Sequence, residues 1–89
     1  MKYSKITGSE NILVSTANQD IAKVKKTGDT YHIRFKAFQF FNYTDCTVIV
    51  NNNDPIFVPA GFGILIEEFE ITSFIIKEKD VKFVWTGGY

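Results

Sequence analysis

Short runs of β-branched and aromatic residues recur along this chain, and Gly, Asn, Asp and Pro separate them at regular intervals. Such punctuated runs are typical of β-strands joined by tight turns, whereas the spacing that indicates an amphipathic helix is nearly absent. Residues 18–26 satisfy neither period, so they are compatible with a strand or with one or two helical turns. The sequence therefore predicts an all-β fold.

About seven or eight short antiparallel strands are expected, a number typical of a small β-sandwich or a partly closed barrel. The runs that predict them cover residues 11–15, 21–26, 31–38, 44–50, 56–58, 63–67, 71–77 and 81–86. A chain of 89 residues with 45% apolar residues has enough material for one core, so we expect a single domain over residues 1–89.

Four polar or Gly-containing segments predict the turns between these strands. Residues 27–29 (Thr-Gly-Asp) indicate a hairpin, and 51–55 (Asn-Asn-Asn-Asp-Pro) a hairpin loop, because Asn and Asp tolerate left-handed backbone. Pro59-Ala60-Gly61 predicts a second tight turn, since Pro presets φ and Gly accepts a positive φ. Lys79-Asp80 marks the last turn.

The segment 31–38 alternates between apolar and cationic or polar residues, which predicts one buried face and one solvated face. Its apolar members are Tyr31, Ile33, Phe35 and Ala37, and the solvated face carries His32, Arg34 and Lys36. The alternation fails at residues 38–41 (Phe-Gln-Phe-Phe), where adjacent aromatic residues face opposite sides. A bend, a bulge or a second buried surface is therefore expected there.

The inventory of reactive side chains argues against catalysis. One Cys and one His cannot form an internal disulfide or a Cys/His zinc site, and no nucleophile elbow or Gly-rich phosphate loop is present. Glu67, Glu68 and Glu70 resemble a carboxylate pair or calcium ligands, but solvated charges beside a turn are the simpler interpretation. We expect no enzyme activity, no metal and no cofactor, and we expect Cys46 to be a buried structural thiol.

Charge and hydropathy also restrict partners and location. The net charge is zero, so the chain lacks the basic field that attracts nucleic acid or anionic lipid. The N-terminus has no apolar segment of a secretory signal, and no run approaches the length that spans a bilayer. We therefore expect a protein without nucleic-acid or membrane partners, residing in the cytoplasm.

Two features predict self-association. Three expected strands are apolar on both faces, at residues 48–50, 64–66 and 74–76, whereas a small sandwich buries one face of each sheet. Charge is also segregated: residues 1–45 carry seven basic and four acidic groups (+3), and residues 46–89 carry three and six (−3). If the two halves form different surfaces, they favour a head-to-tail contact that closes into a ring when the rotation permits.

The C-terminal residues Gly87, Gly88 and Tyr89 place a large ring where fraying is expected, and docking on a neighbouring subunit is one explanation. The residues expected at an interface are Val48, Val50, Phe57, Phe62, Leu65, Phe74, Trp85 and Tyr89. An alternative function is a ligand-binding module, above all for carbohydrate, in which exposed aromatic rings stack on a sugar. Polar partners would then come from residues 51–54 or 67–70.

The second half of the chain resembles small β-sandwich proteins of tailed bacteriophages, which include head-decoration and ring-forming tail-accessory proteins. The resemblance is carried by residues 47–63, in which a strand, an Asn-rich turn, a second strand and a Pro-x-Gly turn follow one another, and by 71–76 and 81–89. It covers about half of the chain and not the first 45 residues. It implies a non-enzymatic virion component that forms homo-oligomers, contacts other virion proteins, and moves from the host cytoplasm into the particle.

Overall fold

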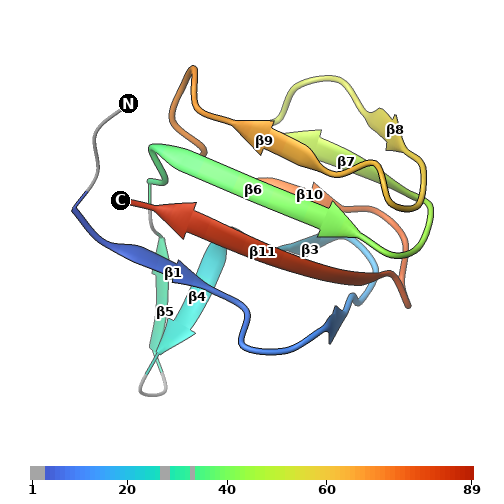
Figure 1. The fold of residues 1–89 in the computed structure, drawn as a ribbon, viewed down its shortest axis with the longest axis horizontal. Helices are drawn as coiled ribbons and strands as arrows, with labels where there is room; N and C mark the ends of the chain where they lie inside the picture. The colour runs from blue at the N-terminus through green and yellow to red at the C-terminus, as the bar shows by residue number, and fades with distance from the viewer. Residues whose placement is uncertain (1–3, 27–28, 33) are drawn as a thin grey trace.

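The structure is a computed structural model that describes residues 4–26, 29–32 and 34–89; for residues 24–26 and 29–32 only the backbone is described. Two antiparallel sheets pack face to face, and a separate hairpin lies beside them (Figure 1). Over the described residues the fold contains strands and no helix. The predicted all-β sandwich is confirmed, and the barrel alternative is not adopted.

The first sheet, sheet A, has the order β1-β11-β6-β9. It consists of β1 (Ile6–Gly8), β11 (Lys82–Gly88), β6 (Ala37–Asn42) and β9 (Ile64–Ile66), and β2 (Leu13–Val14) pairs with the start of β11. All its neighbouring strands are antiparallel. Because β1 and β9 end the sheet, each has one side without a strand partner among the residues that the structure describes.

The second sheet, sheet B, has the order β3-β10-β7-β8. Its strands are β3 (Gln19–Asp20), β10 (Phe74–Ile76), β7 (Cys46–Val50) and β8 (Ile56–Val58). The predicted segments 44–50, 56–58 and 71–77 therefore form neighbouring strands, and β7 and β8 form the predicted hairpin.

The hairpin predicted around residues 27–29 is present as β4 (Lys23–Lys26) and β5 (Asp29–His32), although residues 27 and 28 lie outside the described part. The continuous strand predicted over 31–38 is wrong, because β5 ends at His32 and β6 begins at Ala37 in a different sheet. Phe35 between them makes a bridge to Ile71. The expected position of Ile33 and the side chains of Tyr31 and His32 lie outside the described residues.

The failure of alternation at residues 38–41 reflects a second partly covered surface. β6 pairs with β11 without interruption from Ala37 to Asn42, so no bulge occurs there. Phe38 and Phe40 point into the core, whereas Phe41 lies half-buried on the outer face with its ring 5.0 Å from that of Tyr43.

The predicted turns are confirmed by the backbone. Asn51 and Asn52 have φ of 50° and 60°, and Asp80 in the last turn has φ of 64°. In the Pro59–Gly61 turn, Gly61 has φ of 79° and the N–H of Phe62 donates to the carbonyl of Pro59 at 3.0 Å. Polar turn residues thus supply left-handed backbone where the strands reverse.

Aromatic rings from both sheets fill the space between them. Phe38 stacks on Trp85 of the neighbouring strand at 5.5 Å, and Phe74 of sheet B lies 5.0 Å from Phe38 and 4.9 Å from Phe40. These rings are almost completely buried. Each such ring stabilises the fold mainly through the apolar area that it removes from water.

The C-terminal residues are held by their own chain. The N–H of Tyr89 donates to the Lys5 carbonyl at 2.8 Å, the N–H of Lys5 donates back at 2.9 Å, and the Tyr89 ring lies edge-on to Phe35 at 6.1 Å. The proposed need for a neighbouring subunit to hold this tail is therefore removed. The β1 strand that holds it was not among the strands predicted from the sequence.

Candidate interaction surface

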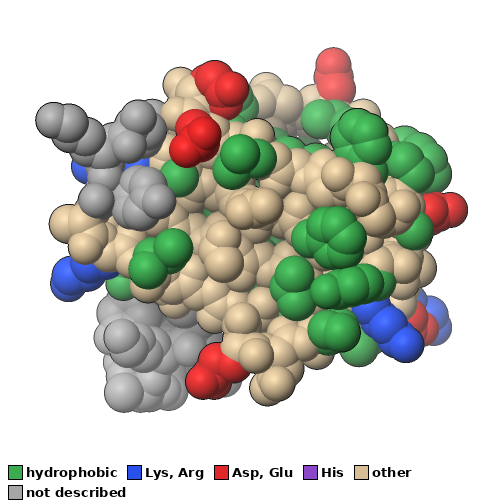
Figure 2. Space-filling model, in the orientation of Figure 1, with side chains coloured by type: hydrophobic (Ala, Val, Ile, Leu, Met, Phe, Trp, Pro, Cys, Tyr) green, Lys and Arg blue, Asp and Glu red, His purple; other side chains and the backbone are tan. Residues whose placement is uncertain are grey.

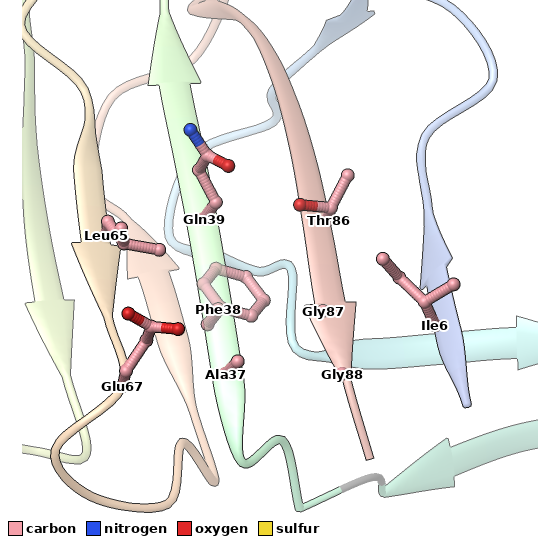
Figure 3. A pocket seen from close by; sticks show the side chains of 9 residues that line it. All are labelled: Ile6, Ala37, Phe38, Gln39, Leu65, Glu67, Thr86, Gly87 and Gly88. Atoms are coloured by element: carbon pink, nitrogen blue, oxygen red, sulfur yellow. The ribbon is translucent and has the colours of Figure 1, made fainter. Parts of the chain in front are cut away.

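The outer face of sheet A presents a row of side chains to solvent. Leu65 of β9, Gln39 of β6 and Thr86 of β11 lie side by side, and Ile6 lies at the opposite edge on β1, two residues along from the partner of Thr86 (Figure 3). Leu65 is 59% exposed and Ile6 is 68% exposed. The surface beside this row is low between Ile6 and Leu65, because Ala37 and Gly88 carry little or no side chain.

Two depressions formed by described residues hollow this face. One of about 280 Å³ lies over Ala37, Gly88 and Thr86 and is bordered by Ile6 and Leu65 (Figure 3). The other, of about 340 Å³, is lined by residues that include Phe41 and Val84. Figure 2 views the molecule from this side and shows apolar side chains gathered where β6 ends and β11 begins. Open, shallow hollows of this kind suit a macromolecular surface better than an enclosed small-molecule site.

A rigid loop beside this face displays Phe62, which is 72% exposed. The buried Asn42 side chain holds the loop: its amide nitrogen donates to the carbonyls of Thr44, Val58 and Pro59 at 2.9–3.0 Å, and its oxygen accepts the N–H of Gly63 at 3.1 Å. The exposed ring is therefore presented by a backbone that is fixed in advance, which lowers the entropic cost of binding.

Asn42 was missed as a key residue. A signal was available, because Asn42 follows Phe38 and Phe40 with the period of two that marks the inward face, so its amide had to be buried and satisfied there.

The residues expected at an interface separate into two groups. Val48, Val50, Phe74 and Trp85 belong to the core, because the period-two alternation of β7, β10 and β11 turns them inward, so their expected place on an outer surface is corrected. Phe57, Phe62 and Leu65 are exposed, and Tyr89 is half-buried against Phe35. The exposed Ile6, at the opposite edge from Leu65, was not among the predicted residues.

In the strands that are apolar on both faces, every second apolar residue points outward, as the alternation of a β-strand requires. Ile49 of β7 and Ile75 of β10 are directly paired on the outer face of sheet B and are half-buried, while Leu65 on sheet A is exposed. The outer faces of both sheets thus carry apolar side chains.

The two edges of the sandwich differ in charge. From residue 45 to residue 76 the chain carries five carboxylates and no Lys or Arg, and this segment forms both edge strands β8 and β9. Residues 1–44 carry seven basic and three acidic groups, a net +4, and form the opposite edge strands β1 and β3, the hairpin and the central strand β6. Beside β1 the described charged side chains are those of Lys5 and Glu10. In Figure 2, carboxylates mark the border on the β9 side.

The acidic side chains do not converge on a site. Glu67, Glu68 and Glu70 are exposed, and one oxygen of Glu68 accepts the N–H of Glu67 at 2.9 Å. Among the described residues there is no group of three His, Cys, Asp or Glu side chains that could hold a metal ion. Nor does this part of the chain contain a helix long and apolar enough to cross a membrane.

Cys46 is 1% exposed at the start of β7, as predicted for a structural thiol. Burial, together with the negative charges of Glu78 and Asp45, raises the pKa of its thiol to about 11. We expect a thiol reagent at pH 8 to modify the native protein at least about 100-fold more slowly than the urea-unfolded protein, because the reactive thiolate is scarce and covered. Equal rates would contradict this account of Cys46.

Glu78 fixes the start of β7 through its side chain. Burial would raise the pKa of this carboxyl, but hydrogen bonds, first the one from the Thr47 N–H at 2.7 Å, outweigh it and lower the pKa below the usual 4.5. The ionised form therefore stabilises the fold above pH 4.5, and this contribution is lost as the pH falls through the lowered pKa. We expect Glu78→Gln to be less stable than the wild type at pH 7, and the difference to shrink toward pH 3 in urea titrations. Glu70→Gln is the control, and a difference independent of pH would contradict the assignment.

Comparison with models of protein families, with curated proteins and with solved structures found no significant match. No family is assigned.

Proposed function

We propose that this chain is a non-enzymatic structural and interaction protein that assembles with copies of itself. The observation that supports the proposal most is the pair of sheet A edges with exposed apolar side chains, Leu65 next to the carboxylates that follow β9 and Ile6 next to Lys5. Complementary charge on two different patches favours a head-to-tail contact rather than a symmetric one.

The finer proposal is a virion accessory component of a tailed phage that forms a ring and contacts other virion proteins. It rests on the order of strand, Asn-rich turn, strand and Pro-x-Gly turn over residues 47–63, which resembles such proteins. A closed ring of fixed subunit number, seen in negative-stain images of the purified protein, is the expected result. Single particles the size of one chain, or open fibres, would contradict the ring.

The carbohydrate-binding alternative has less support. Stacking on a sugar needs exposed rings near one another and close to polar groups. Phe57 lies on sheet B and Phe62 in the β8–β9 loop, and the depression between Ile6 and Leu65 is lined mainly by aliphatic and small residues.

Sedimentation velocity over a concentration series tests self-association. The proposal predicts a species larger than one chain that grows with concentration and then reaches a constant size. A sedimentation coefficient of one chain throughout the series would contradict it.

A further inference from the structure

We infer that neighbouring copies join through the edges of sheet A, with β9 of one copy pairing antiparallel to β1 of the next and Leu65 opposite Ile6. The inference rests on the proposed self-association and identifies the contact. It follows from strand direction, from backbone groups at the edges, and from the side chains and charges beside them.

Strand direction permits this contact. The path β1-β11-β6-β9 contains four strands, all antiparallel to their neighbours, so β1 and β9 run in opposite directions. A second copy placed beside the first in the same orientation therefore brings its β1 antiparallel to β9. An odd number of strands would instead require the less stable parallel pairing.

The backbone of β1 offers groups at its open side. Lys5 and Tyr89 exchange two hydrogen bonds, at 2.9 and 2.8 Å, so Lys5 faces β11. In an antiparallel ladder alternate residues direct their N–H and C=O groups to opposite sides. Ile6 and Gly8 consequently direct theirs away from β11, toward the edge.

The same reasoning identifies Leu65 as the residue of β9 whose backbone N–H and C=O point to the open edge. The carbonyl of Asn42 accepts the N–H of Gly61 at 2.7 Å, and the N–H of Tyr43 donates to Lys82 of β11 at 2.8 Å. The even-numbered residues of β6 therefore face β9, and Gln39, opposite Leu65, faces β11. Leu65 is left with its N–H and C=O directed away from β6.

Side chains agree with this register. Leu65 and Ile6 both lie on the outer face of sheet A, and directly opposite residues of an antiparallel pair share a face (Figure 3). Pairing Leu65 with Ile6 of the next copy joins two apolar side chains that are both more than half exposed in the single chain. Their contact removes apolar surface from water at the junction.

The charged side chains next to the two strands also favour this contact. Glu67 and Glu68 follow β9, and Lys5 precedes β1; all three are exposed. With Leu65 opposite Ile6, Ile66 lies opposite Lys5 of the next copy, so the lysine and the carboxylates that follow β9 line the same junction. Turning one copy around would place β9 against β9 and bring the carboxylates together, which is unfavourable.

Charge-pair exchange tests the contact. Leu65→Lys replaces the apolar partner of Ile6 by a cation, and Ile6→Glu places an anion diagonally opposite Glu67 on the same face of the sheet. We therefore expect each variant alone to associate at least about tenfold more weakly than the wild type. An equimolar mixture is expected to associate again, because Lys at 65 then meets Glu at position 6 of the other variant. Tyr43→Lys, at an exposed site away from both edges, is the matched control and should associate as the wild type does.

The possible results are distinct. A wild-type protein that remains a monomer overturns the proposed function. A wild-type protein that associates while both variants also associate normally, or whose variants are not restored by mixing, overturns the edge pairing alone. Thermal melting shows whether each variant is folded.

Cross-linking supplies a second measurement on folded protein. A double variant with Leu65→Cys and Ile6→Cys is expected to give ladders of covalent multimers under mild oxidation, whereas either single cysteine variant should give none. Dimers of the Leu65→Cys variant alone would show a symmetric β9–β9 contact and overturn the inference.

Discussion

Asn42→Leu is expected to destabilise the protein by about 3–5 kcal/mol, because a side chain of similar size removes every polar contact that the amide makes. Three carbonyls, of Thr44, Val58 and Pro59, lose their donor, and the N–H of Gly63 loses its acceptor. Asn42 is fully buried, so water does not replace these bonds without opening the structure. Urea unfolding monitored by Trp85 fluorescence measures the loss.

Two further variants define the cause. Gln39→Leu changes the same chemical group to the same residue on the outer face of β6, and we expect a change within about 0.5 kcal/mol. Asn42→Asp places a carboxylate beside three carbonyls, so its pKa should rise in the folded state and its stability should recover as the pH falls. A stable Asn42→Leu protein, or an Asn42→Asp protein that is no more stable at pH 4 than at pH 8, would contradict the role of the amide.

Gly87→Ala is expected to lower stability by about 3 kcal/mol, which corresponds to a fall in Tm on the order of 15 °C for a domain of this size. A Cβ at Gly87 would lie 2.5 Å from Cε1 of Phe35 and closer still to its Cδ1. The ring has no free space to move, because it is completely buried against Phe38, Trp85 and Tyr89.

A second substitution tests whether the Phe35 ring causes the loss of stability in Gly87→Ala. Phe35→Leu reduces the ring that meets the new methyl group, so Gly87→Ala should cost clearly less in that background than in the wild type. Thr86→Ala, at the exposed neighbouring position, is expected to change Tm by only a few degrees. Equal costs of Gly87→Ala in both backgrounds would show that Phe35 is not the cause.

The sequence predicted the class of fold and the turns because these depend on local chemistry. The positive φ values at Asn51, Asn52, Gly61 and Asp80 occur where Asn, Gly and Asp had indicated turns. The burial of Cys46 followed from its position in an apolar run.

The arrangement of the strands depended on contacts that are distant in the chain. β1 and β3 have three and two residues and are strands only because β11 and β10 pair with them. The segment 31–38 was interrupted because its two ends join different sheets, a change that alternation alone does not reveal. The described part of the chain therefore contains eleven short strands, nine of them in the two packed sheets, where seven or eight were expected.

The candidate surface was predicted only in part, because it too depends on contacts that are distant in the chain. In an apolar run such as Ile64-Leu65-Ile66 or Val48-Ile49-Val50, composition does not distinguish the inward from the outward residues. Pairing with Gln39 puts Leu65 outside, and packing against the opposite sheet puts Val48 and Val50 inside. Ile6 became part of the surface only when β1 proved to be an edge strand.

Self-association is the central claim, and the mass of the native protein tests it most directly. Native mass spectrometry across a concentration series, with light scattering as a check, is expected to show one defined oligomer well above the 10.2 kDa of a single chain. An oligomer of constant subunit number would support assembly through complementary edges. A mass of 10.2 kDa at every concentration would contradict the account.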